Sequence, residues 1–379
     1  MKLDCSHFDR CSGCSRNEHL DHPKVLIEAQ NFFAAQGLHS FPFHANTPWE
    51  WRCRAKLAVR GSSSLPLIGL FEENSHRVVD IPRCRVHHPS LNLAANILRK
   101  WLIEQKIEPY DENSGKGFLR YIQVTVEKAT QRVQLVLVLN EKPTVVTAEF
   151  EEICRETLLK QNPLLWHSLW FNFNSGKDNV IFGKEWRLIE GEAWLWETLQ
   201  GKEICFHPAS FMQANLDMFD SLLERIKTYV PKNASLLEFY AGVGSIGISL
   251  AEYCQRIRCV EIVSQAKICF EQSLQRLPIH LSKKLSFICG SASEFASLLD
   301  PSIDVAIVDP PRKGLDRLLL QALIQAVHLQ RLIYVSCGWE SFQRDCLALC
   351  NAGWELSHAE AFLFFPGSEH LEILAVFEK

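Results

Sequence analysis

Three cysteines near the start of the chain have a spacing that suits a metal centre. Cys5, Cys11 and Cys14 follow the pattern C-x5-C-x2-C among polar and charged neighbours, which cannot form a hydrophobic core by themselves. Thiolates at such spacing are typical of zinc and iron-sulfur sites, which need a fourth ligand from elsewhere in the fold. Cys84, in a basic turn after a proline, is the predicted fourth ligand, in preference to Cys53 in a predicted strand. The spacing leaves zinc and iron-sulfur equally open, because soft thiolates select both.

Two further residues near the C-terminus could do covalent and acid-base chemistry. Cys337 ends a short apolar run that is typical of a buried strand, so its thiol is a candidate nucleophile at the edge of a sheet. A thiol packed in the core is the alternative. Glu372 begins an otherwise apolar terminal strand, and partial burial there raises the pKa of a carboxyl and makes it a usable base. A solvated charge at a strand end is the alternative for Glu372.

A glycine-rich turn indicates a nucleotide-type binding site. Gly242, Gly244 and Gly247 follow an apolar strand and open a predicted helix, where glycines permit a tight turn and a close approach of a ligand to the backbone. Glu261 ends the next strand, where a carboxylate can hydrogen-bond ribose hydroxyls, and Asp309 ends a later strand just before two prolines that stiffen the loop. This pattern also fits a nicotinamide dinucleotide enzyme, and the glycine motif alone is weak.

Length and composition define the setting of these residues. The 379 residues exceed one comfortable hydrophobic core and predict two domains with a small appendage. Hydrophobic residues make up 47% and charged residues 22%, which excludes intrinsic disorder as the main state. We find no run long enough for a membrane helix and no signal peptide, so we expect a cytoplasmic protein without a membrane partner. The net charge of −4 requires any nucleic-acid partner to meet a local basic patch.

The elements divide the chain into an α/β protein of three parts. Residues 1–47 are predicted to hold the cysteine loop and an N-terminal helix, and residues 48–205 a central, β-rich α/β domain. Helices are expected over residues 89–104 and 147–161. From residue 206 to residue 379, short apolar runs alternate with amphipathic stretches, which predicts a Rossmann-like parallel sheet.

The central domain offers a candidate RNA-binding surface. Arg52, Arg54, Lys56 and Arg60 recur with a period of two, so most of one strand face is predicted to be basic. A plain solvated edge strand is the alternative.

Taken together and in order, these stretches resemble the RNA uracil-C5 methyltransferases that use S-adenosylmethionine. The resemblance covers nearly the whole chain and rests on the cysteine set and on six runs: residues 208–215 (PASFMQAN), 237–244 (LEFYAGVG), 260–263 (VEIV), 309–314 (DPPRKG), 334–337 (YVSC) and 365–372 (FPGSEHLE). It implies that the C-terminal domain is an S-adenosylmethionine-dependent methyltransferase domain and that Cys5, Cys11, Cys14 and Cys84 hold a [4Fe-4S] cluster. It also implies that Gln213, Tyr240, Glu261 and Asp309 hold the cofactor.

The family's chemistry gives the two reactive residues their roles. Uracil C5 is too weak a nucleophile to take a methyl group directly, so the thiolate of Cys337 adds first to C6. Glu372 then removes the C5 proton after methyl transfer. Because the tRNA-modifying branch typically lacks the cysteines and one ribosomal branch carries an extra small β-barrel, the chain is similar to the short ribosomal branch. The expected substrate is therefore a uridine of 23S ribosomal RNA, at position 747, and no obligate protein partner is expected.

Three positions depart from the family pattern, and three alternative functions remain. Gly338 stands where Asn or Asp is common, Ser368 where Thr is usual and Ala241 where Cys is common. The departure at position 338 questions the local support of Cys337. Exocyclic-amine methyltransferases normally place an aromatic after the two prolines, where this chain has Arg312. An iron-sulfur RNA-binding or redox protein is the second alternative, and methylation of a uridine in tRNA or at another rRNA site is the third.

Overall fold

The computed structural model describes residues 3–379, and they form two compact units. The C-terminal unit comprises His19–Asn46 and Trp196–Lys379, and the central unit comprises the loop that ends at Glu18 together with Thr47–Leu195. The cysteine loop therefore belongs to the central unit, whereas the N-terminal helix belongs to the C-terminal unit. The second division lies at residue 195 instead of the expected residue 205.

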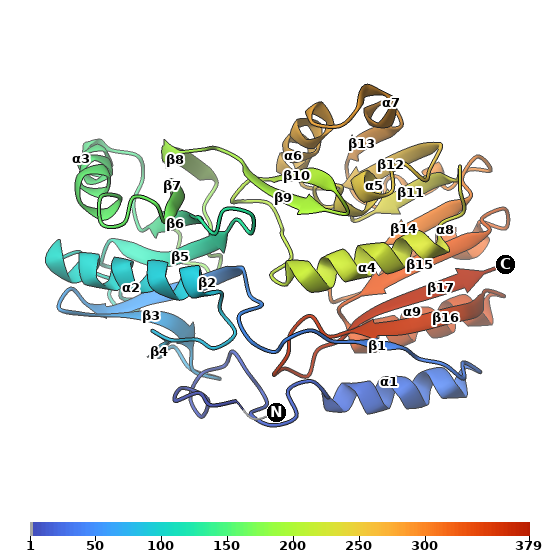
Figure 1. The fold of residues 1–379 in the computed structure, drawn as a ribbon, viewed down its shortest axis with the longest axis horizontal. Helices are drawn as coiled ribbons and strands as arrows, with labels where there is room; N and C mark the ends of the chain where they lie inside the picture. Colours follow the sequence, from blue (N-terminus) through green and yellow to red (C-terminus); the bar gives the residue numbers. More distant parts are fainter. Residues whose placement is uncertain (1–2) are drawn as a thin grey trace. The chain divides into compact units, whose positions relative to one another are not determined.

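An eight-stranded, mainly parallel sheet forms the C-terminal unit (Figure 1). Its order is β1-β16-β17-β15-β14-β11-β12-β13. The bounds are β1 Phe43–His44, β11 Ser235–Phe239, β12 Arg256–Glu261, β13 Leu285–Cys289, β14 Val305–Val308, β15 Arg331–Ser336, β16 Glu355–Phe362 and β17 Glu372–Glu378. β17 runs antiparallel between β15 and β16. The central strand β14 is buried throughout, as the continuous apolar run of a covered parallel strand requires.

Helices alternate with the strands of this sheet, as the sequence pattern predicted. They are α1 Lys24–Ala35, α4 Leu216–Tyr229, α5 Ser245–Ser249, α6 Ser264–Gln275, α7 Ile279–Ser282, α8 Arg317–Gln325 and α9 Trp339–Asn351, with a 3₁₀ turn at Ala296–Leu298. One hydrophobic cluster contains residues from α1, α8 and α9 and from the central strands, for example Phe33, Leu319 and Phe342. α4 crosses in front of the strands in Figure 1 and contacts β17. A two-stranded sheet of β9 Leu195–Leu199 and β10 Lys202–Phe206 precedes α4.

The central unit is a seven-stranded sheet with the order β4-β3-β2-β5-β6-β7-β8. Its elements are β2 Arg54–Ser62, β3 Leu65–Phe71, β4 Val78–Asp80, β5 Leu119–Val126, β6 Val133–Leu139, β7 Trp166–Phe173 and β8 Glu185–Gly191, with α2 Pro89–Glu104, α3 Val145–Ile153 and a π-helical turn at Cys154–Leu158. α2 spans the predicted residues, because Pro89 opens it, His88 caps it and its apolar stripe is buried. α3 and the π turn occupy most of the second predicted helix.

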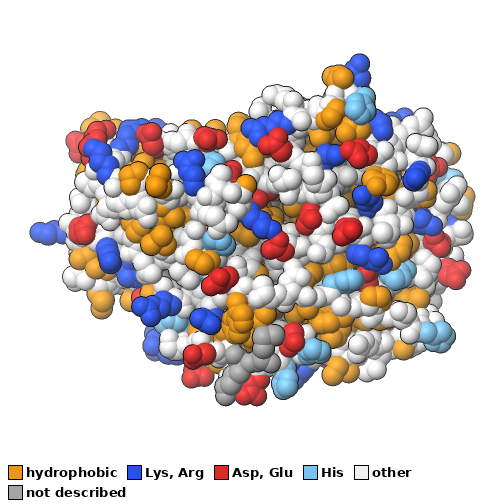
Figure 2. Space-filling model, viewed as in Figure 1, with side chains coloured by type: hydrophobic (Ala, Val, Ile, Leu, Met, Phe, Trp, Pro, Cys, Tyr) orange, Lys and Arg blue, Asp and Glu red, His pale blue; other side chains and the backbone are white. Residues whose placement is uncertain are grey.

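The basic face expected on β2 is only partly exposed. Lys56 is exposed, but Arg60 is 8% exposed and forms an ion pair with Glu112. Arg60 also donates to the carbonyl oxygen of Arg120 at 2.8 Å. The prediction that Arg60 extends a cationic surface is therefore wrong, because a carboxylate 52 residues away in the sequence binds it. On the face seen in Figure 2, positive and negative side chains are interspersed.

The structure contains no candidate for a membrane-spanning segment within residues 3–379, since none of the helices there is both long enough and apolar enough.

Candidate active site

Cys337 and Glu372 are placed by two neighbouring strands. β15 and β17 pair antiparallel, with Ser336 opposite Ile373. The same register brings Cys337, directly after Ser336, level with Glu372, directly before Ile373. β14 pairs parallel with β15 on the other side, with Val308 opposite Tyr334, so Asp309 follows β14 at the same edge of the sheet. The structure thus brings together three predicted site residues, all at the carboxyl ends of β14 and β15, where α/β folds place their chemistry.

The charges at this edge act on one another. Burial and, to a smaller extent, the carboxyls of Glu372 and Asp309 together raise the pKa of Cys337 to about 12, against the opposing effect of the Arg312 guanidinium. Burial also raises the pKa of Asp309 to about 7 and that of Glu372 well above its ordinary value. A buried carboxyl with a raised pKa is a suitable proton acceptor, and Arg312 is the cation that favours the thiolate.

Gly338 allows the loop after β14 to lie against the turn that follows Cys337. A Cβ atom at position 338 would come within 2.4 Å of the carbonyl oxygen of Arg312. The backbone N–H of Gly338 donates to Oγ of Ser336 at 3.2 Å, and Ser341 Oγ donates to the carbonyl of Gly338 at 3.0 Å. Two serines therefore hold the turn that follows Cys337.

A pocket lies at the end of β11 and holds three of the four predicted cofactor ligands. Gln213, Tyr240 and Asp309 line it, together with Gly242 of the glycine-rich turn. Gly242 and Gly244 have φ values of 55° and 78°, a conformation that favours glycine. Glu261 is outside the lining. Its Oε2 accepts the backbone N–H of Gly242 at 3.0 Å, so Glu261 fixes the turn that forms the pocket wall.

Tyr240 is held in an unusual conformation at this pocket. Its φ of 59° lies in the left-handed region, which a non-glycine residue adopts only at a cost. Its hydroxyl donates to Oδ2 of Asp316 at 2.8 Å, and Asp316 also caps α8 by accepting the N–H of Leu319 at 3.0 Å. Burial raises the pKa of Tyr240, so the hydroxyl stays protonated. Sequence reasoning missed Asp316, which carries no motif of its own.

Glu238 is a second residue that sequence reasoning missed. It lies inside β11, lines the same pocket and is 1% exposed. Its Oε2 accepts the N–H of Gly247 at 2.9 Å, and burial raises its pKa to about 8. The available signal was a carboxylate inside an apolar strand, because a buried acid is retained only where it has partners.

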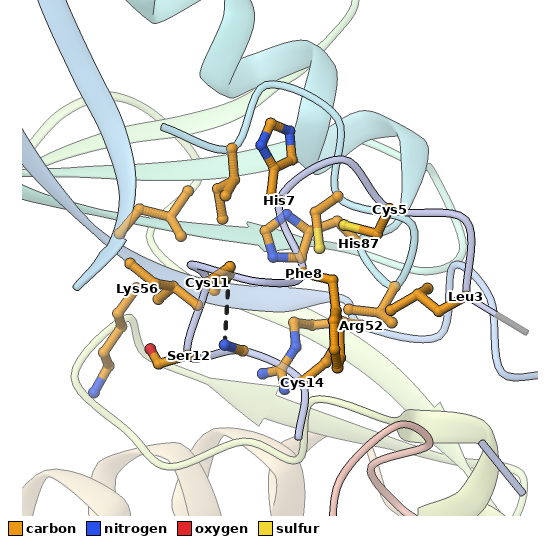
Figure 3. A pocket seen from close by; sticks show the side chains of 17 residues that line it. Leu3, Cys5, His7, Phe8, Cys11, Ser12, Cys14, Arg52, Lys56 and His87 are labelled. Atoms are coloured by element: carbon orange, nitrogen blue, oxygen red, sulfur yellow. Dashed lines mark hydrogen bonds between the residues drawn. The ribbon is translucent and has the colours of Figure 1, made fainter. Parts of the chain in front are cut away.

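The four predicted metal ligands line one cavity in the central unit, with a volume of about 340 Å³. Figure 3 shows the side chains of Cys5, Cys11 and Cys14 around this cavity, and Cys84 also lines it. Burial and the nearby thiols, Cys84 foremost, together raise the pKa of Cys14 to about 12. Within residues 3–379, no three Cys, His, Asp or Glu side chains form a group that could hold a single metal ion. The cysteines are gathered, but a metal site is not shown.

Backbone N–H groups point toward two of these sulfur atoms. The N–H of Gly13 donates to Sγ of Cys11 at 3.4 Å, the bond drawn as a dashed line in Figure 3. The N–H groups of Val86 and His87 hydrogen-bond Cys84 and lower its pKa, although burial outweighs them and raises it. Such donors are typical around thiolates that ligate iron-sulfur clusters, so the donor set fits the predicted group.

The fold is that of a known methyltransferase structure. The structure superposes on a Pyrococcus abyssi tRNA (uracil-54, C5)-methyltransferase in complex with S-adenosyl-L-homocysteine with a TM-score of 0.74, at 23% sequence identity, over 93% of this chain and 82% of that one. The α/β fold is therefore that of S-adenosylmethionine-dependent methyltransferases, and this part of the fold prediction is confirmed.

Sequence comparisons give the family. Residues 184–379 match the family model of the tRNA (uracil-5-)-methyltransferases. A relative from Protochlamydia amoebophila, named an uncharacterized RNA methyltransferase, is 44% identical over all of this chain and 98% of its own length. One from Listeria monocytogenes, with the same description, is 27% identical over 98% of this chain and 83% of its own. The chain belongs to the tRNA (uracil-5-)-methyltransferase family, and it is an S-adenosylmethionine-dependent RNA (uracil-C5) methyltransferase, as the resemblance implied.

Proposed function

We propose that this enzyme methylates C5 of a uridine in 23S ribosomal RNA, with Cys337 as nucleophile and Glu372 as base. The observation that carries the assignment of roles is the β15–β17 register, which sets Cys337 and Glu372 side by side at the sheet edge that also carries Asp309. A thiol and a buried carboxyl at such an edge are the two groups that a C5 methylation needs.

The reaction proceeds in three steps at the uracil ring. The Cys337 thiolate forms a bond to C6, and the electrons of the C5–C6 double bond move into an enolate that is nucleophilic at C5. S-adenosylmethionine supplies the methyl group on a sulfonium, which needs no metal to be electrophilic. Once C5 carries the methyl group, Glu372 accepts the C5 proton, the C6–sulfur bond breaks and the ring double bond returns.

Before this step, Cys337 must ionise in an environment that opposes it. Its pKa of about 12 leaves it protonated in the free enzyme at neutral pH. Arg312 is positioned to favour the thiolate, because it is the cation that lowers the pKa of Cys337. Glu372 and Asp309 oppose ionisation only when they are charged, and burial keeps their pKa values high. The thiol proton leaves to solvent, and Glu372 must be ionised when it accepts the C5 proton, so its raised pKa sets a lower pH limit for turnover.

The cofactor pocket supports the proposed ligands. Gln213, Tyr240 and Asp309 line one wall around the glycine turn, where main-chain atoms are open to a ligand. Glu261 is proposed to hold the ribose hydroxyls. Its two carboxylate oxygens accept the N–H groups of Gly242 and Val263 at 3.0 and 2.9 Å, and each oxygen keeps a lone pair for a further donor.

The cysteine cavity is proposed to hold a [4Fe-4S] cluster through Cys5, Cys11, Cys14 and Cys84. A cluster spreads its ligands farther apart than a single ion does, and four thiols around one cavity with N–H donors on two of them support it. Methyl transfer is redox-neutral, so the cluster is assigned to folding and RNA contact, not to electron transfer. Retention of methylation by a protein whose intact cluster has been reduced or oxidised is the expected result.

The choice of RNA is tested by mapping modified uridines. The proposed target is uridine 747 of 23S rRNA, and a tRNA uridine is the second candidate, because both the family description and the Pyrococcus abyssi enzyme name tRNA. Mass spectrometry of 5-methyluridine in rRNA and tRNA from cells lacking the protein is expected to show the loss at one 23S rRNA site only. Loss from tRNA instead would transfer the assignment to the second candidate.

The nucleophile is tested by covalent trapping. RNA with 5-fluorouridine at the target position cannot release its C5 substituent as a proton, so the Cys337–C6 bond is expected to persist with the wild-type enzyme. Cys337→Ala should bind cofactor and RNA normally but give no adduct. An adduct that maps to another residue, or methylation retained by Cys337→Ala, overturns the mechanism.

A further inference from the structure

Helix α9 is fastened to the loop that follows β14. The single hydroxyl proton of Ser341 is shared between the carbonyl oxygens of Arg312 at 2.8 Å and Gly338 at 3.0 Å. Arg344 Nη2 donates to the carbonyl that follows that of Arg312 at 3.0 Å. Asp345 Oδ2 accepts the backbone N–H of Leu315 at 2.8 Å. The three α9 residues stand at positions i, i+3 and i+4 and therefore share one helix face. That face binds the backbone of the loop, not its side chains.

Asp345 is the most enclosed of the three. Its side chain has no exposed area, and it also accepts the hydroxyl of buried Tyr334 at 2.9 Å and Nε of Arg344 at 2.9 Å. Burying a carboxylate costs several kcal/mol unless hydrogen bonds offset it. The hydrogen bonds of Asp345 connect the end of β15 to the loop after β14, because Tyr334 stands three residues before Cys337 and Leu315 three residues after Arg312.

Two glycines let the loop come this close. A Cβ at Gly314 would lie 2.6 Å from both Arg344 Nη2 and Asp345 Oδ2. A Cβ at Gly338 would lie 2.4 Å from the carbonyl oxygen of Arg312. The contact at position 338 is to backbone, so a larger residue there would displace the loop, and Gly314 has a φ of 80°, which favours glycine.

We propose that Ser341 and Asp345 are positioning residues that hold the Arg312 loop against the turn of Cys337, so that the Arg312 cation stays beside the reacting thiol. The inference rests on the proposed role of Cys337 and adds residues that touch neither substrate nor cofactor. Ser341 acts through the Arg312 carbonyl, and Asp345 acts through the Leu315 N–H and the Tyr334 hydroxyl.

The consequence is electrostatic. Burial has the largest effect on the Cys337 pKa and raises it, and the charged groups that act on the thiol are the carboxyls of Glu372 and Asp309 and the guanidinium of Arg312. Arg312 alone among them lowers the pKa. Releasing its loop removes that effect and leaves the two carboxyls in place, because β14 and β17 hold them independently of the α9 contacts.

The test measures alkylation of Cys337 by iodoacetamide as a function of pH in the full-length enzyme with its cofactors, with the site quantified by peptide mass spectrometry. Ser341→Ala and Asp345→Asn are expected to shift the profile upward by about half a pH unit or more, which is about threefold slower alkylation at a fixed pH. We expect kcat for methyl transfer to fall about tenfold while KM for S-adenosylmethionine changes less than about twofold. Wild-type profiles and kcat in both variants would overturn the proposal.

A matched control separates positioning from general stability. Asp304 Oδ2 accepts the N–H of Ser235 at 2.8 Å at the opposite edge of the same sheet, just as Asp345 accepts that of Leu315. Asp304→Asn should lower thermal stability without moving the alkylation profile. Should Asp345→Asn not fold, Ser341→Ala carries the test, and Gly338→Ala displaces the same loop from the other side, with the same expected shift.

The outcomes also separate this inference from the proposed function. If Cys337→Ala retains methyl transfer, the nucleophile itself is wrongly assigned. If Cys337→Ala is inactive and forms no adduct while Ser341→Ala and Asp345→Asn match the wild type, the nucleophile stands and only the positioning role fails.

Discussion

The backbone N–H of Gly247 donates to Oε2 of Glu238 at 2.9 Å and joins the first turn of α5 to the middle of β11. No other residue fits at position 247, because a Cβ there would lie 2.7 Å from that oxygen and 2.8 Å from Sγ of Cys259. The bond sets the height of the glycine turn above the strand and thereby shapes the cofactor pocket.

Gly247→Ala is expected to destabilise the enzyme by about 1 to 3 kcal/mol, because the added methyl group overpacks a buried contact. The glycine turn should shift with it and weaken S-adenosylmethionine binding severalfold in calorimetry. Ser249→Ala in the same helix is the control, since it removes one hydroxyl bonded to the carbonyl of Ser245 and adds no volume. Equal cofactor affinity in Gly247→Ala and wild type would contradict this view.

Asp316→Asn separates the support of Tyr240 from the capping of α8. Asparagine keeps the acceptor oxygen for the Leu319 N–H, so helix stability should change by less than about 0.5 kcal/mol. The Tyr240 hydroxyl loses its charged acceptor, and we expect the Kd of S-adenosylmethionine to rise severalfold. Asp316→Ala should show the same weakening plus a loss of about 1 kcal/mol from the missing cap. An unchanged Kd in both variants would show that Asp316 does not support the cofactor site.

Glu372→Gln is expected to stop the reaction after methyl transfer. The amide cannot accept the C5 proton, so kcat should fall by about two to four orders of magnitude and the enzyme–RNA adduct should accumulate on ordinary uridine RNA. Denaturing gels with labelled RNA measure this adduct. Because the pKa of Glu372 is raised by burial, kcat of the wild type should also rise with pH above the ordinary carboxyl range. Turnover by Glu372→Gln without adduct would remove Glu372 from the mechanism.

A buried carboxylate far from the chemistry predicts a pH dependence of folding. Glu360 has no exposed side-chain area and accepts hydrogen bonds from His44 and Arg225. Burial would raise its pKa, but bonds from His358, Arg225 and His44 outweigh burial and lower it to about 2. The folded value lies below the unfolded one, so this contribution is present above about pH 4.3 and is lost as the pH falls toward 2.

Glu360→Gln should therefore lose about 2 kcal/mol of unfolding free energy at pH 7 and show a flatter decline below pH 4.5 than the wild type does. Urea unfolding across that range measures both. Glu203→Gln is the matched control, because Glu203 pairs with Arg276 at an exposed position. If the unfolding free energies of Glu360→Gln and the wild type depend on pH in the same way, Glu360 is not the source of the acid destabilisation.

Removing one cysteine of the N-terminal cavity should release the proposed cluster. Cys84→Ser is expected to abolish the visible absorbance and the bound iron and sulfide of anaerobically purified protein, and to lower Tm by several degrees. Cys289→Ser, at an exposed thiol, should keep both. Full iron content in Cys84→Ser would exclude Cys84 as a ligand.

Several elements were predictable because their signal is local. Helix α2 begins at Pro89 as expected, and the alternating pattern after residue 205 predicted the mainly parallel sheet. The predicted helix after the glycine turn is present but short, since α5 ends at Ser249 and continues only as turns. The two pairing partners of β15 could not be ordered from the sequence, because strand order depends on non-local contacts.

The domain boundaries also depend on contacts between residues that are distant in the sequence. Residues 1–47 read as one segment, but the structure assigns the loop up to Glu18 to the central unit and α1 to the C-terminal unit, where Phe33 packs on Trp339 and Phe342. The sequence of an amphipathic helix predicts that one face is apolar and will be buried, but not which core buries it. The apolar face of α1 packs against α9, which lies about 300 residues later in the sequence, as the contact of Phe33 with Phe342 shows.

The sequence by itself determined the chemistry that is available: a thiol and a carboxylate at strand ends, a glycine turn, and a cysteine set, each encoded within a few neighbouring residues. The tertiary structure alone decided which groups meet. The β15–β17 register places Cys337 level with Glu372. Arg60 forms an ion pair with Glu112 and is not exposed to solvent as expected. Three acidic residues, Glu238, Asp316 and Asp345, form hydrogen bonds with partners distant in sequence. The physical reason is that hydrogen bonds and burial depend on distance in space, which the spacing of residues along the chain does not specify.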